Sequence, residues 1–143
     1  MTTIDKAPVH LWIVGAVSAL WNSFGVIDYT MTQTGSEAWL SQLEPALRAY
    51  VESAPVWANL AWAFGVWGAF AGSLLLLLRR RLAIPAFAAS LGGLAFNTFW
   101  QFGASDGLAI MGSGALWMNL TIWAVAIALL VYALRMKSAG VLR

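Results

Sequence analysis

The stretch that decides the fold runs from Trp57 to Leu78, WANLAWAFGVWGAFAGSLLLLL, and Arg79, Arg80 and Arg81 follow it directly. It contains no charged residue. As an α-helix it is long enough to cross the roughly 30 Å hydrocarbon core of a bilayer. Because basic clusters are enriched on the cytoplasmic side of a membrane, the triple arginine predicts that this helix ends in the cytoplasm.

The composition of the whole chain indicates the same class of protein. Of its 143 residues 61% are hydrophobic and 10% are charged, with a mean hydropathy of +0.75, whereas a soluble domain is about a quarter charged. The length predicts one domain, residues 1–143. Without cysteine, and with His10 as its single histidine, the chain excludes thiolate and multi-histidine metal sites. The net charge of +2 is small, and the sequence has no basic cluster of the kind that binds nucleic acid. We therefore expect no metal, cofactor or nucleic acid.

Four stretches have the length and apolar character of spanning helices, residues 8–29, 57–78, 82–102 and 115–134. Seven of the eight basic residues then fall on one side of the membrane, and these are Lys6, Arg79, Arg80, Arg81, Arg135, Lys137 and Arg143. The other side holds Arg48 and the acidic residues Asp28, Glu37, Glu44, Glu52 and Asp106. The positive-inside rule therefore predicts that both the N- and the C-terminus are cytoplasmic.

The segment between the first two spans, residues 35–53, is predicted to form an amphipathic helix that lies on the outer membrane surface or caps the bundle. Thr34 to Glu37 fits a capping box at its start, and Pro45 is expected to bend or break it. Its apolar residues recur at helical spacing, and these are Trp39, Leu40, Leu43, Leu47, Tyr50 and Val51. An ordinary covered loop is the alternative interpretation.

A weak internal repeat relates the two halves of the chain. WNSF at 21–24 resembles FNTF at 96–99, an offset of 75 residues, and WANL at 57–60 resembles WMNL at 117–120, an offset of 60. The amphipathic segment accounts for the difference. Each half is then a hairpin that enters and leaves on the cytoplasmic side, so the two repeats are parallel. The alternative is chance similarity between helices rich in Trp, Gly and Ala.

Small and polar residues share one face of three predicted helices, which favours close helix packing in an all-α bundle of four spanning helices. These faces are Gly15, Ser18, Asn22 and Gly25; Ala61, Gly65, Gly68 and Gly72; and Ser90, Gly93, Asn97 and Gln101. From the repeat we expect Asn22 and Asn97 to lie at equal depth. Asp28 is predicted to contact lipid headgroups or water at the outer rim, and a carboxylate pair with Asp106 is the alternative.

Amide and indole side chains gather in the outer half of this bundle. The candidate ligand-binding residues are Asn22, Asn59, Asn97, Asn119, Gln101, Trp21, Trp57, Trp100 and Trp117. An unpaired amide in lipid costs several kcal/mol, so these groups must be paired or wet. They indicate one of two arrangements. The first is an outward-facing pocket, in which the amides bind hydroxyl groups of a ligand and the indoles stack on its ring. The second is a set of hydrogen bonds between helices together with an interfacial aromatic belt.

WNSFGVIDYTMTQT at 21–34, with GVWG at 65–68 and the leucine run before Arg79, resembles a family of small bacterial inner-membrane proteins that are often labelled "sugar transporter". The resemblance covers most of the chain. It implies a multi-pass protein of the bacterial inner (cytoplasmic) membrane and is compatible with a sugar-like ligand at the Asn and Trp positions.

Two functions follow as hypotheses. The first is a carrier or binder of a small polar (sugar-like) or amphipathic ligand that works as a homo-oligomer in the lipid bilayer. The second is a non-catalytic accessory or assembly subunit of a larger membrane complex. An enzyme is not expected, because the sequence shows no acid–base set, nucleophile triad or phosphate loop.

Overall fold

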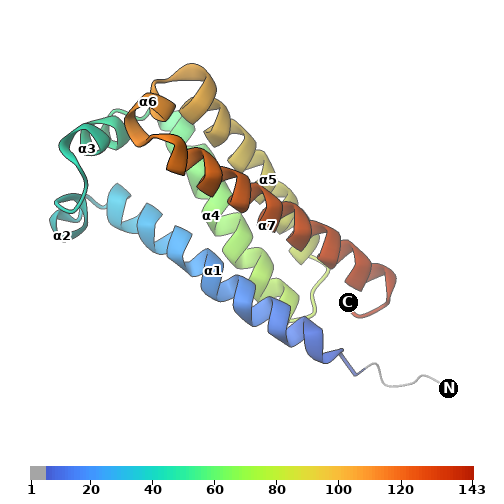
Figure 1. Cartoon of the computed structure of the whole chain (residues 1–143). Helices are drawn as coiled ribbons and strands as arrows, with labels where there is room; N and C mark the ends of the chain where they lie inside the picture. Colours follow the sequence, from blue (N-terminus) through green and yellow to red (C-terminus); the bar gives the residue numbers. More distant parts are fainter. Residues whose placement is uncertain (1–5) are drawn as a thin grey trace.

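The computed structural model describes residues 6–143; most of the polar tail predicted before the first helix lies outside these residues. The described chain is all-α, as predicted, and has no strand. Its elements in order are α1 (Val9–Gln33), α2 (Glu37–Leu40), α3 (Pro45–Glu52), α4 (Val56–Leu77), α5 (Ala83–Phe99), the π-helical turn η1 (Trp100–Ala104), α6 (Gly107–Met111) and α7 (Ser113–Ser138) (Figure 1).

Three helices, α1, α4 and α7, are long and apolar enough to cross a membrane. The sequence placed all three, although α1 and α7 each continue four residues beyond their expected ends. The stretch expected at 82–102 forms a shorter α-helix, α5, of 17 residues. It passes directly into η1, whose wider turn extends the helical rod to Ala104.

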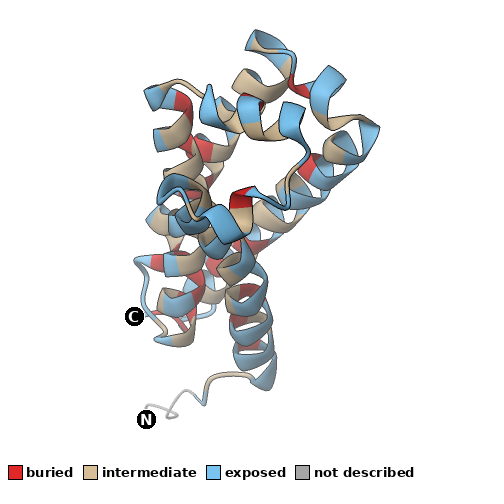
Figure 2. Ribbon diagram, turned by 90° about the vertical axis from the view of Figure 1, so that its left-hand side faces the viewer, coloured by how far each residue is buried: buried red, intermediate tan, exposed pale blue. Residues whose placement is uncertain are grey.

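The long helices pack as neighbours in the order α1, α4, α5 and α7. The α4–α5 contact is the closest, because a Cβ on Gly93 would come within 2.4 Å of the Ala61 carbonyl oxygen and 2.5 Å of the Gly65 nitrogen. Ser90 Oγ donates a hydrogen bond of 2.6 Å to the Gly65 carbonyl across the same contact. The small-residue faces therefore meet as the sequence predicted, and Figure 2 shows buried positions along the helix contacts.

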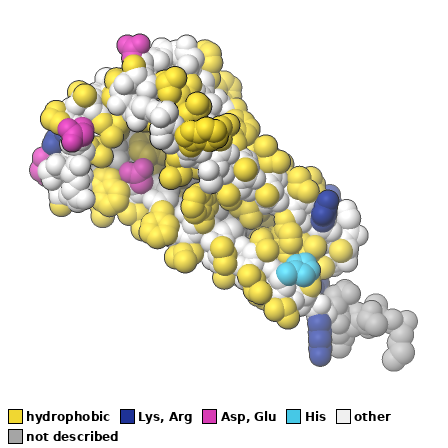
Figure 3. All heavy atoms as spheres, in the orientation of Figure 1, with side chains coloured by type: hydrophobic (Ala, Val, Ile, Leu, Met, Phe, Trp, Pro, Cys, Tyr) yellow, Lys and Arg dark blue, Asp and Glu magenta, His cyan; other side chains and the backbone are white. Residues whose placement is uncertain are grey.

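Charge divides the molecule along its length. The end where α1 begins and α7 finishes is here called the inner end, and the end with α2, α3 and α6 the outer end. Figure 3 shows Lys and Arg side chains at the inner end and most of the acidic side chains at the outer end. This is the separation that the sequence predicted.

The last residues fold back onto the inner end. The Arg143 N–H donates to the Arg79 carbonyl at 2.7 Å, and the Arg81 N–H donates to the Arg143 carbonyl at 2.9 Å. Leu142 is completely buried. It belongs to the main apolar core, whose other members are Leu11, Leu76, Ala83, Phe87, Leu129, Ala133 and Val141. The tail thus ties the α4–α5 turn to the base of α1 and α7.

The outer end is covered by α2 and α3, which we call the cap. The expected capping box at Thr34 is wrong, because α1 continues to Gln33 and Thr34 closes it by donating its hydroxyl to the Thr30 carbonyl at 2.7 Å. Instead Ser36 precedes α2. The break expected at Pro45 is confirmed: the amphipathic segment forms two short helices rather than one, and Pro45 starts the second, where its missing N–H is harmless.

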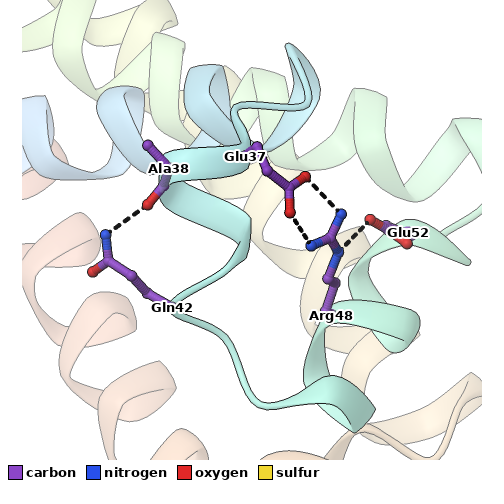
Figure 4. A network of polar contacts seen from close by, with 5 residues as sticks. All are labelled: Glu37, Ala38, Gln42, Arg48 and Glu52. Carbon is purple, nitrogen blue, oxygen red and sulfur yellow. Dashed lines mark hydrogen bonds and ion pairs between the residues drawn. The ribbon is translucent and has the colours of Figure 1, made fainter.

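Arg48 joins the two helices of the cap (Figure 4). Its guanidinium donates to both carboxylate oxygens of Glu37, at 2.7 and 3.0 Å, and its Nε donates to Glu52 at 2.9 Å. The hydrogen bond from Arg48, with the attraction between the charges, lowers the pKa of Glu37 from its ordinary value of 4.5. The Arg48 pKa is raised in return.

This pair predicts a pH dependence of the cap. Because the pKa of Glu37 is lowered in the folded protein, the pair stabilises the cap above pH 4.5 and its contribution is lost as the pH falls through the lowered pKa. We expect the protection of the α2 and α3 amides, which is their exchange rate relative to the intrinsic rate at the same pH, to fall below that pH. In Arg48→Met the exchange should already be faster at neutral pH and should lack this acid-dependent step. The same step in the variant would contradict the assignment.

Candidate functional site

A cavity of about 220 Å³, here called the outer cavity, lies beneath the cap. Its floor and walls come from α1, α4, α5 and η1, and its roof comes from Leu43, Leu47 and Tyr50. Leu43 and Leu47 therefore turn towards the bundle, which is one of the two placements, membrane surface or bundle cap, that the sequence left open. The polar and aromatic side chains that line the cavity are Asp28, Thr32, Asn59, Trp62, Asn97, Trp100, Gln101 and Tyr50.

A stacked aromatic pair closes one side of the outer cavity. The rings of Tyr50 and Trp100 lie 4.7 Å apart at 16°, and the Tyr50 hydroxyl is 2.8 Å from Ser105 Oγ. Burial raises the pKa of Tyr50, with the Ser105 hydrogen bond opposing it, so this phenol stays neutral. Gly107 makes the closure possible, because a Cβ there would meet the Gln101 carbonyl at 2.2 Å and the Tyr50 hydroxyl at 2.6 Å.

Two amides in the cavity have no hydrogen-bond partner within the described part of the chain. The side chains of Asn97 and Gln101 make no hydrogen bond to any residue between 6 and 143, although both line the cavity. Gln101 lies in the π turn, a feature that often occurs at functional sites. Asn59 is engaged instead, accepting from Gln33 at 3.1 Å and donating to the Ala54 carbonyl at 3.3 Å. The free amides are therefore available to water or a ligand.

The other two candidate amides tie helices together. Asn22 donates to the Ala69 carbonyl at 3.2 Å and to Ser73 Oγ at 3.0 Å, which joins α1 to α4. Asn119 donates to Thr98 Oγ1 at 3.1 Å, which joins α7 to α5. The expectation that Asn22 and Asn97 lie at equal depth is wrong, because Asn22 bonds α4 towards its inner end while Asn97 faces the cavity at its outer end.

The four candidate tryptophans also separate. Trp100 lines the cavity, whereas Trp21 lines a different hollow on the side of the bundle. Trp57 and Trp117 are 44% and 69% exposed and do not line the outer cavity. Their position near the outer end is that of an interfacial aromatic belt. The structure thus brings together Asn59, Asn97, Trp100 and Gln101 from the candidate set.

Sequence reasoning missed Asp28 as a cavity residue. Asp28 was expected to contact headgroups, but α1 continues beyond it to Gln33, which places the carboxylate below the cap. It accepts a hydrogen bond of 3.1 Å from the indole nitrogen of Trp39. Trp62, which packs edge-on against Tyr29 at 5.1 Å, was missed as well. The sequence does contain a signal for this position of Asp28. Thr34 and Gly35 are typical of the end of a helix, and they indicate that α1 continues past Asp28.

No protein-family model, curated protein or solved structure matches this chain. The residues described here do not include a cluster of His, Cys, Asp or Glu that could hold a metal ion. The outer cavity and its free amides are therefore the observations on which a function can be argued.

Proposed function

We propose that this protein is an integral membrane protein that binds a small, hydroxylated, sugar-like ligand in the outer cavity, as a binder or a carrier. One observation supports it most: Asn97 and Gln101 present unpaired amides in a cavity that also holds Trp62 and Trp100. Each amide offers two donors and one acceptor, which match hydroxyl groups. The indole rings offer apolar faces for the carbon skeleton.

The size of the cavity limits the ligand. Its volume of about 220 Å³ lies below the roughly 300 Å³ at which drug-sized pockets begin. A ligand about the size of a monosaccharide therefore fits this cavity better than a larger one. A larger ligand would need the cap to open, and the short links on either side of α2 and α3 are where it would move.

In the same proposal α5 and η1 together form a fourth span, so that the chain is a four-helix membrane bundle of two parallel hairpins. The inner end faces the cytoplasm of a bacterium, and the cap faces outward. The segregated charges support this orientation. When fused after Arg143, a reporter that works only in the cytoplasm should be active, and a reporter that works only in the periplasm should be inactive. The opposite pattern would reject the orientation.

Binding to the cavity can be separated from helix packing by two matched variants. Asn97→Leu removes a free amide at similar volume, and Asn22→Leu removes an amide that ties α1 to α4. Titration of the purified protein with monosaccharides and polyols, followed by tryptophan fluorescence, should show a Kd about five- to tenfold higher for Asn97→Leu. Asn22→Leu should lower stability by about 1 kcal/mol and leave Kd unchanged. Equal Kd values for both variants and the wild type would contradict the proposal.

The second candidate function is that of a subunit of a larger membrane complex. It is favoured by a shallow apolar groove on the side of the bundle, between α4 and α5. This groove is lined by small residues, Ala89, Gly92 and Gly93, and by aromatic residues that include Phe64 and Phe96. Small residues of this kind let a partner's transmembrane helix approach closely. Native mass analysis from membranes distinguishes the candidates, since a stable larger partner favours the subunit and a homo-oligomer favours the binder.

A further inference from the structure

A second hollow, here called the lateral hollow, opens on the side of the bundle between α1 and α7. Its volume is about 460 Å³, and its walls include Trp21, Phe24, Val66, Met118 and Ile122. Among residues 6–143, one side-chain hydrogen bond links α1 to α7, and it lies between His10 Nδ1 and the Tyr132 hydroxyl near the inner end. Further out the two helices leave this hollow open, and Figure 3 shows an acidic side chain inside a recess edged by hydrophobic ones.

Asp28 is the residue that joins the two spaces. It lines both the outer cavity and the lateral hollow, and it is the acidic residue that either space contains. Its carboxylate therefore lies at the boundary between the cavity that contains the free amides and the opening on the side of the bundle. The lateral hollow is walled mainly by apolar side chains, so this opening suits a hydrocarbon chain.

The charge of Asp28 has no counterion in the described protein. Its hydrogen-bond partner is the neutral indole of Trp39. The ion pairs found between residues 6 and 143 both involve Arg48, whose guanidinium is already held by Glu37 and Glu52. Asp28 is exposed in the structure, and the lateral hollow beside it has mainly apolar walls. Where those walls face lipid, a carboxylate there is costly unless a cation pairs with it.

We propose that the ligand of this site is an amphipathic organic cation, an alkylamine whose ammonium group pairs with Asp28. Its polar head lies in the outer cavity near Asn97 and Gln101, and its alkyl chain leaves through the lateral hollow towards the lipid. Trp39, whose indole N–H donates to this carboxylate, lines the lateral hollow, and Trp62 lines the outer cavity, so each space has aromatic surface for the ligand. This inference rests on the proposed function in taking the outer cavity as a ligand site, and it assigns that site a second ligand class, an organic cation.

The test uses matched amphiphiles on the full-length protein in phosphatidylcholine nanodiscs, with empty nanodiscs to subtract partitioning. Octylammonium, neutral octyl glucoside and anionic octyl sulfate are titrated against tryptophan fluorescence. The wild type should bind octylammonium at least about tenfold more tightly than Asp28→Asn does, the loss expected for a charge-assisted pair. Asp28→Glu should restore most of the difference. Octyl glucoside should bind the wild type and Asp28→Asn equally.

Asp106→Asn is the matched control, because Asp106 lies at the same end of the molecule but lines neither space. It should leave all three affinities unchanged.

If octylammonium binds no more tightly than octyl glucoside, or is insensitive to Asp28→Asn, the cation assignment is overturned while binding in the outer cavity stands. If octylammonium depends on Asp28 but no neutral ligand responds to Asn97→Leu, the proposed hydroxylated ligand fails and the cation site stands. If no probe binds, both are rejected.

Discussion

Gly93→Ala is expected to lower the free energy of unfolding by about 3 kcal/mol, the upper end of what overpacking usually costs. The added methyl group would lie 2.4 Å from the Ala61 carbonyl oxygen and 2.5 Å from the Gly65 nitrogen. Both are backbone atoms, so no change of rotamer can relieve the overlap. Instead α4 and α5 must move apart, which breaks the contact that holds the centre of the bundle and loosens the hydrogen bond from Ser90 to the Gly65 carbonyl.

The neighbouring glycine provides the control. A Cβ on Gly92 meets nothing within 4 Å, so Gly92→Ala should be neutral or should stabilise the helix by up to about 1 kcal/mol through helix propensity. Unfolding by titration with sodium dodecyl sulfate in mixed micelles measures both variants. Equal stabilities for Gly92→Ala and Gly93→Ala would show that α4 and α5 do not approach as closely as described.

Leu142→Ala is expected to cost about 2–5 kcal/mol, the range for removing a completely buried leucine from a packed core. Leu142 is 0% exposed and packs in the cluster that includes Leu11, Leu76 and Leu129. Its loss leaves a void where the tail, the α4–α5 turn and the base of α1 and α7 meet. The backbone hydrogen bonds between Arg143 and Arg79 should weaken with it.

Thermal unfolding followed by circular dichroism, together with limited proteolysis of the tail, measures this effect. Val131→Ala is the control, because Val131 is 42% exposed on α7 and should change stability by no more than about 0.5 kcal/mol. A tail in Leu142→Ala that resists protease as well as the wild type does would contradict the packing assigned to Leu142.

The site itself was only partly predictable from the sequence. The amides and indoles of the outer half were identified as candidates, and Asn59, Asn97, Trp100 and Gln101 do line one cavity. Asn22 and Asn119 have the same chemistry and similar local sequence, but they face Ser73 and Thr98 and are consumed by hydrogen bonds between helices. Which amide is free depends on the residue opposite it on another helix, and a one-chain pattern carries no information on that.

The sequence by itself determined the helical class, three membrane-length helices, the small-residue contact faces, the segregation of charge and the amphipathic character of the cap. These features follow from helix periodicity, hydrophobic length and charge, which are local properties of the chain. Only the tertiary structure decided that α1 continues past Asp28, that the tail returns to bury Leu142, and that α1 and α7 leave a lateral hollow. These depend on contacts between segments far apart in the chain, where packing overrides local signals.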